Sequence, residues 1–79
     1  MPRINIPGPY HIYFVSFDCH EPPHVHVARE NMEAKFWLTP IRIAYHHRFK
    51  RKELNRIGQL LTAHQKDILE AWHEHCHNA

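Results

Sequence analysis

The sequence predicts an α+β domain, in which a three- to four-stranded antiparallel sheet is followed by one long bent helix or by two helices. Between about residues 10 and 44, short aromatic and β-branched runs are separated by turns that contain proline, which is typical of strands. From about residue 50 to residue 76, apolar residues recur with the helical period of 3.6. Strands that precede helices along the chain indicate separate sheet and helix layers. The 79 residues suit a single domain spanning residues 1–79.

The first two strands are expected on either side of a proline loop. Residues 10–17 are largely apolar in both alternating sets, as in a strand that is covered on both faces. The proline pair at 22 and 23 then interrupts the sheet. From residue 24 to residue 28 the alternation is strict. It places Val25 and Val27 on the core side and His24 and His26 together on the opposite face.

The next two strands continue the antiparallel order. A four-residue connection at 29–32 suits a hairpin into residues 33–38. In that segment, one face is apolar and consists of Ala34, Phe36 and Leu38. Pro40 ends this strand, and residues 41–44 are expected to add a short fourth one.

The helical part carries one apolar stripe, which consists of Leu54, Ile57, Leu61, Ile68 and Trp72 and is widened by Leu60 and Leu69. Thr62 followed by Gln65 matches a capping box, which favours a break near Ala63. One bent helix and two helices both remain open. Trp72 is expected to be buried against the sheet, beside Ile68 and Leu69.

Composition excludes several classes of protein. No run of residues is apolar enough to span a membrane and no signal-peptide pattern is present, so we expect no membrane partner and a cytoplasmic location. Cys19 and Cys76 are too few to predict a disulfide framework, which suits a reducing compartment. The sequence lacks a glycine-rich phosphate loop, a serine nucleophile elbow and a Cys-x-x-Cys pair.

Ten histidines among 79 residues point to metal binding or acid–base chemistry. The densest group lies at 20–26, where His24 and His26 are expected to share one face of a strand and the proline pair is expected to return His20 toward them. Three imidazoles predict an open zinc or nickel site. They equally suit a general acid and base pair for cleaving a phosphodiester. The alternative is a pair of solvent-side histidines that make backbone hydrogen bonds.

A basic block lies in the middle of the chain, where residues 42–56 hold six cations against one carboxylate, Glu53. Cations at a helix start oppose the helix dipole by on the order of tenths of a kcal/mol each. The arrangement therefore suits an anion-binding site for a phosphate group, although a solvated face is the alternative. The residues expected to bind the anion, named here the basic block, are Arg48, Lys50, Arg51, Lys52 and Arg56.

The C-terminal tail repeats the pattern of metal ligands more weakly. On a helix, His73 lies one turn from Cys76 and His77, which is a spacing for metal ligands. A helix end without a rigid second element holds a metal poorly, and histidines there also favour the helix dipole. The tail is therefore not among the expected sites.

Three segments carry a resemblance to a known family: Asp18-Cys19-His20-Glu21-Pro22-Pro23-His24-Val25-His26-Val27, Glu33-Ala34-Lys35-Phe36-Trp37-Leu38 and His64-Gln65-Lys66-Asp67-Ile68-Leu69-Glu70-Ala71-Trp72. They resemble a small bacterial family catalogued as domain of unknown function 4160. The resemblance implies that the family-type residues of this chain are His20, His24, His26, His64 and Trp72.

The resemblance also implies a two-gene module similar to a toxin–antitoxin pair, because genes of this family often lie beside those of domain of unknown function 2442. The expected partners are a small protein of that type, nucleic acid or a second copy of the chain. The favoured function is a binding module that uses the basic block. The alternative is a minimal ribonuclease, metal-free or metal-dependent, centred on the histidines.

Overall fold

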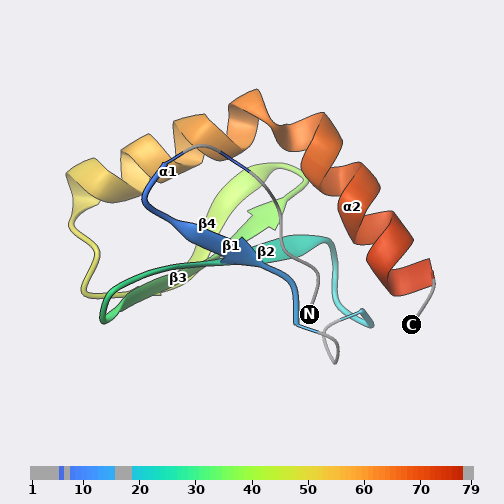
Figure 1. The fold of residues 1–79 in the computed structure, drawn as a ribbon, viewed down its shortest axis with the longest axis horizontal. Helices are drawn as coiled ribbons and strands as arrows, with labels where there is room; N and C mark the ends of the chain where they lie inside the picture. The colour runs from blue at the N-terminus through green and yellow to red at the C-terminus, as the bar shows by residue number, and fades with distance from the viewer. Residues whose placement is uncertain (1–5, 7, 16–18, 78–79) are drawn as a thin grey trace.

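A computed structural model describes residue 6, residues 8–15 and residues 19–77. Its strands form one four-stranded antiparallel sheet, and two helices lie over one face of that sheet (Figure 1). The predicted α+β class is confirmed, and of the two helical arrangements left open the structure has two helices. In chain order the elements are β1 (His11–Tyr13), β2 (His24–Arg29), β3 (Met32–Leu38), β4 (Ile41–His47), α1 (Arg51–Ala63) and α2 (Gln65–His77).

The strands follow one another in the order β1-β2-β3-β4, each antiparallel to the next. The hairpin turn between β2 and β3 is shorter than predicted, because Arg29 pairs with Met32 and extends both strands. The fourth strand is longer than predicted, because its pairing with β3 continues to His47. The first strand ends early, at Tyr13, and residues 16 and 17 of the predicted strand lie outside the described residues.

A β-bulge changes the phase of β4. Ile43 pairs with Phe36 while Tyr45 pairs with the preceding residue of β3, Lys35, so Ala44 is an extra residue in the strand. Two residues spaced by two normally share one face of a strand. Because of the bulge, Ile43 instead faces the helix side with Phe36, and Tyr45 faces the opposite side with Lys35.

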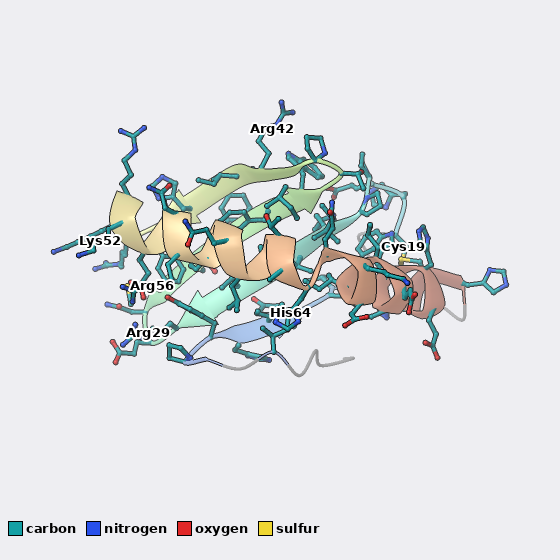
Figure 2. All side chains as sticks on the ribbon, turned by 90° about the horizontal axis from the view of Figure 1, so that it is seen from above. Cys19, Arg29, Arg42, Lys52, Arg56 and His64 are labelled. Carbon is teal, nitrogen blue, oxygen red and sulfur yellow. A yellow bond between two sulfur atoms is a disulfide. The ribbon has the colours of Figure 1, made fainter. Side chains whose placement is uncertain are left out.

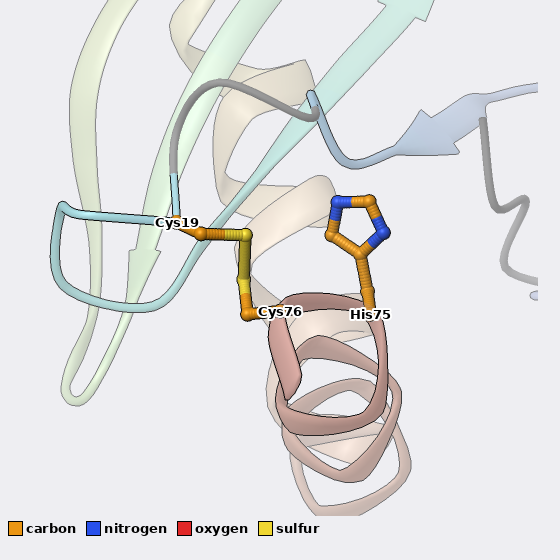
Figure 3. A group of neighbouring side chains, drawn as sticks. All are labelled: Cys19, His75 and Cys76. Atoms are coloured by element: carbon orange, nitrogen blue, oxygen red, sulfur yellow. A yellow bond between two sulfur atoms is a disulfide. The ribbon is translucent and has the colours of Figure 1, made fainter. Parts of the chain in front are cut away.

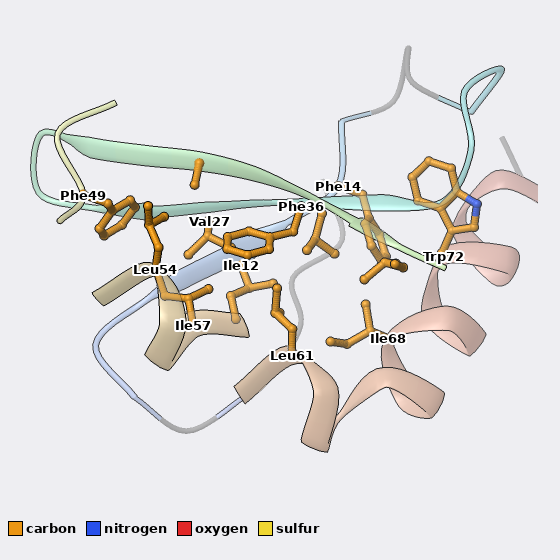
Figure 4. Packing of buried hydrophobic residues seen from close by; sticks show 13 residues of the cluster. Ile12, Phe14, Val27, Phe36, Phe49, Leu54, Ile57, Leu61, Ile68 and Trp72 are labelled. Atoms are coloured by element: carbon orange, nitrogen blue, oxygen red, sulfur yellow. The ribbon is translucent and has the colours of Figure 1, made fainter. Parts of the chain in front are cut away.

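One hydrophobic core lies between the sheet and the helices (Figure 4). Val25 and Val27 are buried in it while the two alternating histidines face the other way, as the sequence predicts. Trp72 is 4% exposed and belongs to the same core as Ile68, with Leu69 partly buried against it, which confirms the predicted position of the tryptophan. The buried apolar residues of the described chain are Ile12, Phe14, Val25, Val27, Ala34, Phe36, Leu38, Phe49, Leu54, Ile57, Leu61, Ile68 and Trp72.

The two helices are separated at His64, close to the predicted break. The predicted capping box is wrong: Thr62 and Gln65 make other hydrogen bonds, so a capping box does not cause this break. The Thr62 hydroxyl donates to the carbonyl of Gly58, one turn back, and the Gln65 side chain donates to the carbonyl of Leu38 at the end of β3, at 2.6 Å. The start of α2 is therefore bonded to the sheet. Each helix has 13 residues, and within the described ranges no helix has the length and apolar character needed to cross a membrane.

Candidate nucleic-acid-binding surface

The face of the sheet that turns away from the helices is lined by aromatic, imidazole and cationic side chains. Strand register places Tyr13 opposite His26, His26 opposite Lys35, and Lys35 opposite Tyr45, so one row crosses all four strands. Neighbouring strands lie about 4.8 Å apart, which makes the row about 14 Å long. Neither helix of the described chain covers this face (Figure 1). We call this surface the open face; beside the row it carries His11, Glu33, Trp37, Arg42 and His47.

Aromatic rings lie at both ends of the row. The ring of Tyr13 stacks on that of His26, with centroids 5.3 Å apart and an interplanar angle of 21°. At the other end, Tyr45 is 42% exposed, and its ring centroid lies 5.9 Å from that of His47. Burial, with smaller contributions from Glu33 and Tyr45, raises the pKa of Tyr13, so its phenol stays uncharged at neutral pH. Flat, uncharged rings of this kind suit stacking against nucleic-acid bases.

Lys35 lies near the centre of the row and connects it to the loop before β2. Its Nζ lies 2.6 Å from Oε1 of Glu21 and 4.6 Å from the ring centroid of Trp37. The lysine side chain is only 13% exposed. The ion pair therefore holds the loop against the open face, and one cation remains fixed among the rings.

The three histidines of the proline-containing motif lie in different environments. His24 has no exposed surface, and its Nδ1 donates to the carbonyl of Pro22 at 2.9 Å. The centroid of its ring lies 5.0 Å from that of Trp72, which reaches it from α2. His20 is exposed, and His26 is partly buried on the open face. His24 is therefore a packed residue at one end of the sheet.

The structure does not gather these histidines into a ligand set for a metal. Within the described ranges, one group of three ligating side chains has all its ligand atoms within 4.8 Å of one another, and it consists of Cys19, His75 and Cys76. The zinc or nickel site expected at His20, His24 and His26 therefore receives no support from the geometry.

The basic block lies around the start of α1, at one end of the molecule (Figure 2). Lys50, Lys52 and Arg56 line a hollow of about 290 Å³ together with Arg29 and Glu53. Four cations surround one carboxylate there, so the hollow carries net positive charge. Arg29 is not among the cations predicted from the sequence, because it is far from them along the chain and comes next to them only through the fold.

The other two cations of the basic block lie apart from this hollow. Arg51 is exposed in the first turn of α1. Arg48, which follows β4, lines a second hollow of about 410 Å³ with His47 and residues of the β2–β3 turn. Since His47 belongs to the open face, Arg48 connects that face to the basic block.

Glu53 lies in the first turn of α1, and its carboxylate accepts two hydrogen bonds. The Tyr10 hydroxyl donates to its Oε2 at 2.9 Å, and Arg29 donates to the same oxygen at 2.7 Å. The Tyr10 hydrogen bond first, and then the hydrogen bond and charge of Arg29, lower the pKa of Glu53. A carboxylate in the first turn also interacts favourably with the helix dipole, and at this helix start the N-cap residue, Lys50, makes no side-chain capping bond.

A family model described as Domain of unknown function (DUF4160) matches residues 10–73. The chain belongs to the DUF4160 family. The match extends from the start of the sheet into α2, so it includes the open face and the basic block of this DUF4160 protein. No curated protein and no solved structure matches the chain.

Two further family-type residues of this DUF4160 protein, His64 and Trp72, lie in the helical part of the fold. His64 lies partly buried at the junction of the two helices. Trp72, in α2, is buried against the sheet, with its ring centroid 5.5 Å from that of Phe14 and 5.0 Å from that of His24. The family-type pair His24 and Trp72 thus forms a contact between the sheet and the last helix.

A disulfide bond between Cys19 and Cys76 joins the loop before β2 to the last turn of α2, with the Cα atoms 5.4 Å apart. Two cysteines separated by 57 positions give no local signal, so the sequence did not predict this disulfide. The bond supplies the second element that the tail was expected to lack. His75 lies next to this bond, whereas the tail histidines selected by spacing, His73 and His77, are exposed.

Proposed function

We propose that this DUF4160 protein binds single-stranded nucleic acid, with bases on the open face and phosphates at the basic block. The observation that carries the proposal is the row Tyr13, His26, Lys35 and Tyr45 across all four strands. Unpaired bases stack on aromatic side chains, and each such contact contributes about 1–3 kcal/mol. Sheet surfaces with central aromatic residues bind RNA in this way.

The cations support the proposal because they follow the row at one end of the sheet. His47 is the last residue of β4, two positions after Tyr45, and Arg48 follows it. The positively charged hollow at the start of α1 comes next along the chain. A strand of nucleic acid that stacks on Tyr45 leaves the open face beside the hollow of His47 and Arg48, which Glu30 and Glu33 also line. Phosphate contacts of this kind provide affinity without selecting a base sequence.

Stacking on this face also determines which form of nucleic acid binds. In a duplex, the base faces are covered by neighbouring base pairs, so only unpaired bases reach Tyr13 and Tyr45. We therefore expect single strands to bind more tightly than a duplex of the same length. A pure basic surface would show no such preference, because it contacts phosphates alone.

The ribonuclease alternative is less well supported than binding. An acid and base pair must both reach the phosphodiester that is cleaved. His26 is on the open face, but His24 has no exposed surface and its Nδ1 donates to the carbonyl of Pro22. His24 and His26 therefore do not form an accessible pair, which favours binding without cleavage.

A protein partner is the second candidate, favoured by a groove between β4 and α1. The groove has a volume of about 600 Å³ and is lined largely by apolar side chains. It includes Ile43, which is 41% exposed. The two-gene module implied by the family resemblance, similar to a toxin–antitoxin pair, requires a surface of this kind for its second protein. This groove lies on the helix side of β4, although Arg42, which belongs to the open face, also borders it.

The β-bulge provides a matched pair of variants for testing the two candidates. Tyr45 and Ile43 lie on the same strand with nearly equal exposure, 42% and 41%, but on opposite faces of the sheet. We expect Tyr45→Ala to weaken binding of a labelled single-stranded RNA by about tenfold or more, measured by fluorescence anisotropy at fixed salt. Ile43→Ala is expected to leave RNA binding unchanged.

The comparison has clear opposite outcomes. Equal RNA affinity of Tyr45→Ala and the wild type contradicts the proposal, as does tighter binding of a duplex than of the single strand. Loss of RNA binding in Ile43→Ala alone moves the interface to the groove between β4 and α1. Circular dichroism spectra of both variants check that the fold is retained.

A further inference from the structure

Cys19, His75 and Cys76 form a compact cluster where the loop before β2 meets the end of α2 (Figure 3). Their ligand atoms all lie within 4.8 Å of one another, and all three residues are partly buried. The two sulfur atoms are bonded as a disulfide, and the imidazole of His75 lies next to them.

The imidazole of His75 packs against an aromatic ring, but one of its two nitrogens has no hydrogen-bond partner within the described residues. Its ring stacks on that of Phe14, with centroids 5.4 Å apart and an interplanar angle of 27°. Its Nε2 is buried and has no hydrogen bond to any residue that the structure describes. A buried polar atom without a partner is unfavourable, and it calls for an explanation such as a bound water, a bound ion or a redox role.

The chemistry of the three side chains suits a transition metal. Two thiolates and one imidazole are a known ligand set for zinc, which leaves a fourth position for water. In a tetrahedral zinc site the ligand atoms lie about 3.5–3.8 Å apart, so small side-chain movements from the present cluster are sufficient. Soft sulfur ligands also disfavour magnesium and calcium, which prefer oxygen.

We propose that Cys19, His75 and Cys76 form a zinc site that is available only when the disulfide is reduced. The bonded sulfur atoms carry no negative charge and are poor ligands, whereas free thiolates bind zinc. The disulfide and the zinc complex are therefore alternative states of one cluster. Both states join the loop before β2 to α2. Oxidation then releases the ion while the two segments stay connected.

The exchange between the two states balances in atoms and electrons. A phosphine breaks the S–S bond, takes an oxygen atom from water to become a phosphine oxide, and the two hydrogens of that water end on the two thiols. Each thiol loses its proton when zinc binds. In the reverse direction, a disulfide oxidant accepts two electrons from the thiolates, becomes two thiols with protons from water, and zinc leaves.

The zinc site concerns this chain rather than the DUF4160 family as a whole, and it does not depend on nucleic-acid binding. The family model matches residues 10–73, so His75 and Cys76 lie beyond the matched segment. The cluster is also separate from the row of the open face, since it is built from the loop before β2 and the last turn of α2.

Zinc analysis of the untagged protein tests the proposal. One sample is reduced with a phosphine and another keeps its disulfide; both are given excess zinc, dialysed without oxygen and analysed by mass spectrometry. We expect the reduced sample to retain about one zinc ion per chain more than the disulfide sample. Cobalt(II) added to the reduced protein is expected to produce a thiolate-to-cobalt charge-transfer band in the near ultraviolet.

Two histidine variants provide the matched control. His75→Gln removes the third ligand and is expected to weaken zinc binding to the reduced protein by at least about tenfold. His73→Gln changes an exposed histidine of the same helix and is expected to have no effect. Both variants keep the two cysteines, and circular dichroism spectra check that each variant retains the fold. Cys76→Ser gives a second test and is expected to lose the cobalt charge-transfer band.

Three results overturn the proposal. The first is equal zinc content in the reduced and disulfide samples, which means that other histidines hold the ion. The second is an equal loss of affinity in the two histidine variants. The third is a cobalt complex of the reduced protein without a thiolate charge-transfer band.

Discussion

The imidazole of His24 packs against the indole of Trp72, with ring centroids 5.0 Å apart. His24 begins β2, and Trp72 lies in the last helix, so this contact joins the second strand to α2. Both are residues through which the chain resembles its family. A histidine of a conspicuous His-x-His motif thus contributes to the packing of the fold, while its neighbour on the same face, His26, is the one that reaches the open face.

The two histidines of this motif are predicted to respond differently to substitution. We expect His24→Ala to lower the free energy of unfolding by about 2–5 kcal/mol, as for other large buried side chains, because it leaves a cavity beside Trp72. His26→Ala removes a partly buried side chain from the open face and is expected to cost less than about 1 kcal/mol. Urea denaturation of both variants measures the difference. Equal losses contradict the packing role assigned to His24.

Trp72 is predicted to be essential for folding. Trp72→Ala should cost about 3–5 kcal/mol, because the indole is 4% exposed and lies against both Phe14 and His24. A loss of this size is a large part of the stability of a domain this small. Thermal unfolding followed by circular dichroism provides the measurement, with the exposed neighbour His73→Ala as the control. An unchanged melting temperature of Trp72→Ala refutes the prediction.

Local sequence patterns were sufficient for the elements but not for the phase of the last strand. Alternation correctly separated Val25 and Val27 from His24 and His26, because it depends only on the geometry of one strand. The bulge at Ala44 arises from pairing between two strands. No periodicity of β4 alone shows that Tyr45 belongs to the open face.

The site residues that sequence analysis missed depend on contacts between distant segments. Arg29 joins the basic block only because β2 ends beside the first turn of α1. The Cys19–Cys76 disulfide joins a loop to the last helix, and the burial of His24 depends partly on Trp72 from that same helix. Each of these contacts requires the folded topology, which residue spacing does not provide.

The carboxylate of Glu53 predicts a specific loss of stability in acid. The Tyr10 and Arg29 hydrogen bonds lower its pKa in the folded protein below the ordinary value of 4.5. Its contribution is therefore complete above the unfolded pKa and is lost as the pH falls through the lower, folded pKa. The difference in unfolding free energy between wild type and Glu53→Gln should be constant near neutral pH and shrink in acid. Chemical denaturation between pH 7 and about pH 3 measures it.

A second variant distinguishes the cause of this acid effect. Tyr10→Phe removes the hydrogen bond that contributes most to the low pKa of Glu53, while leaving the carboxylate in place. The acid-sensitive part of the stability is expected to be smaller in Tyr10→Phe than in the wild type. A difference between wild type and Glu53→Gln that does not vary from pH 7 to about pH 3 shows that these hydrogen bonds do not favour the ionised form.

The salt dependence of RNA binding is predicted to count the cations that contact phosphates. Each cation that pairs with a phosphate displaces a condensed counterion, so the logarithm of the affinity falls linearly with the logarithm of salt concentration. Lys50 and Lys52 line the same charged hollow, and replacing both with glutamine should reduce this slope by roughly two. Stability should rise slightly, because two cations leave a helix start. The control is Lys66→Gln, an exposed lysine of α2 outside this hollow, whose slope should equal that of the wild type. A double variant with the wild-type slope shows instead that these lysines form a solvated face.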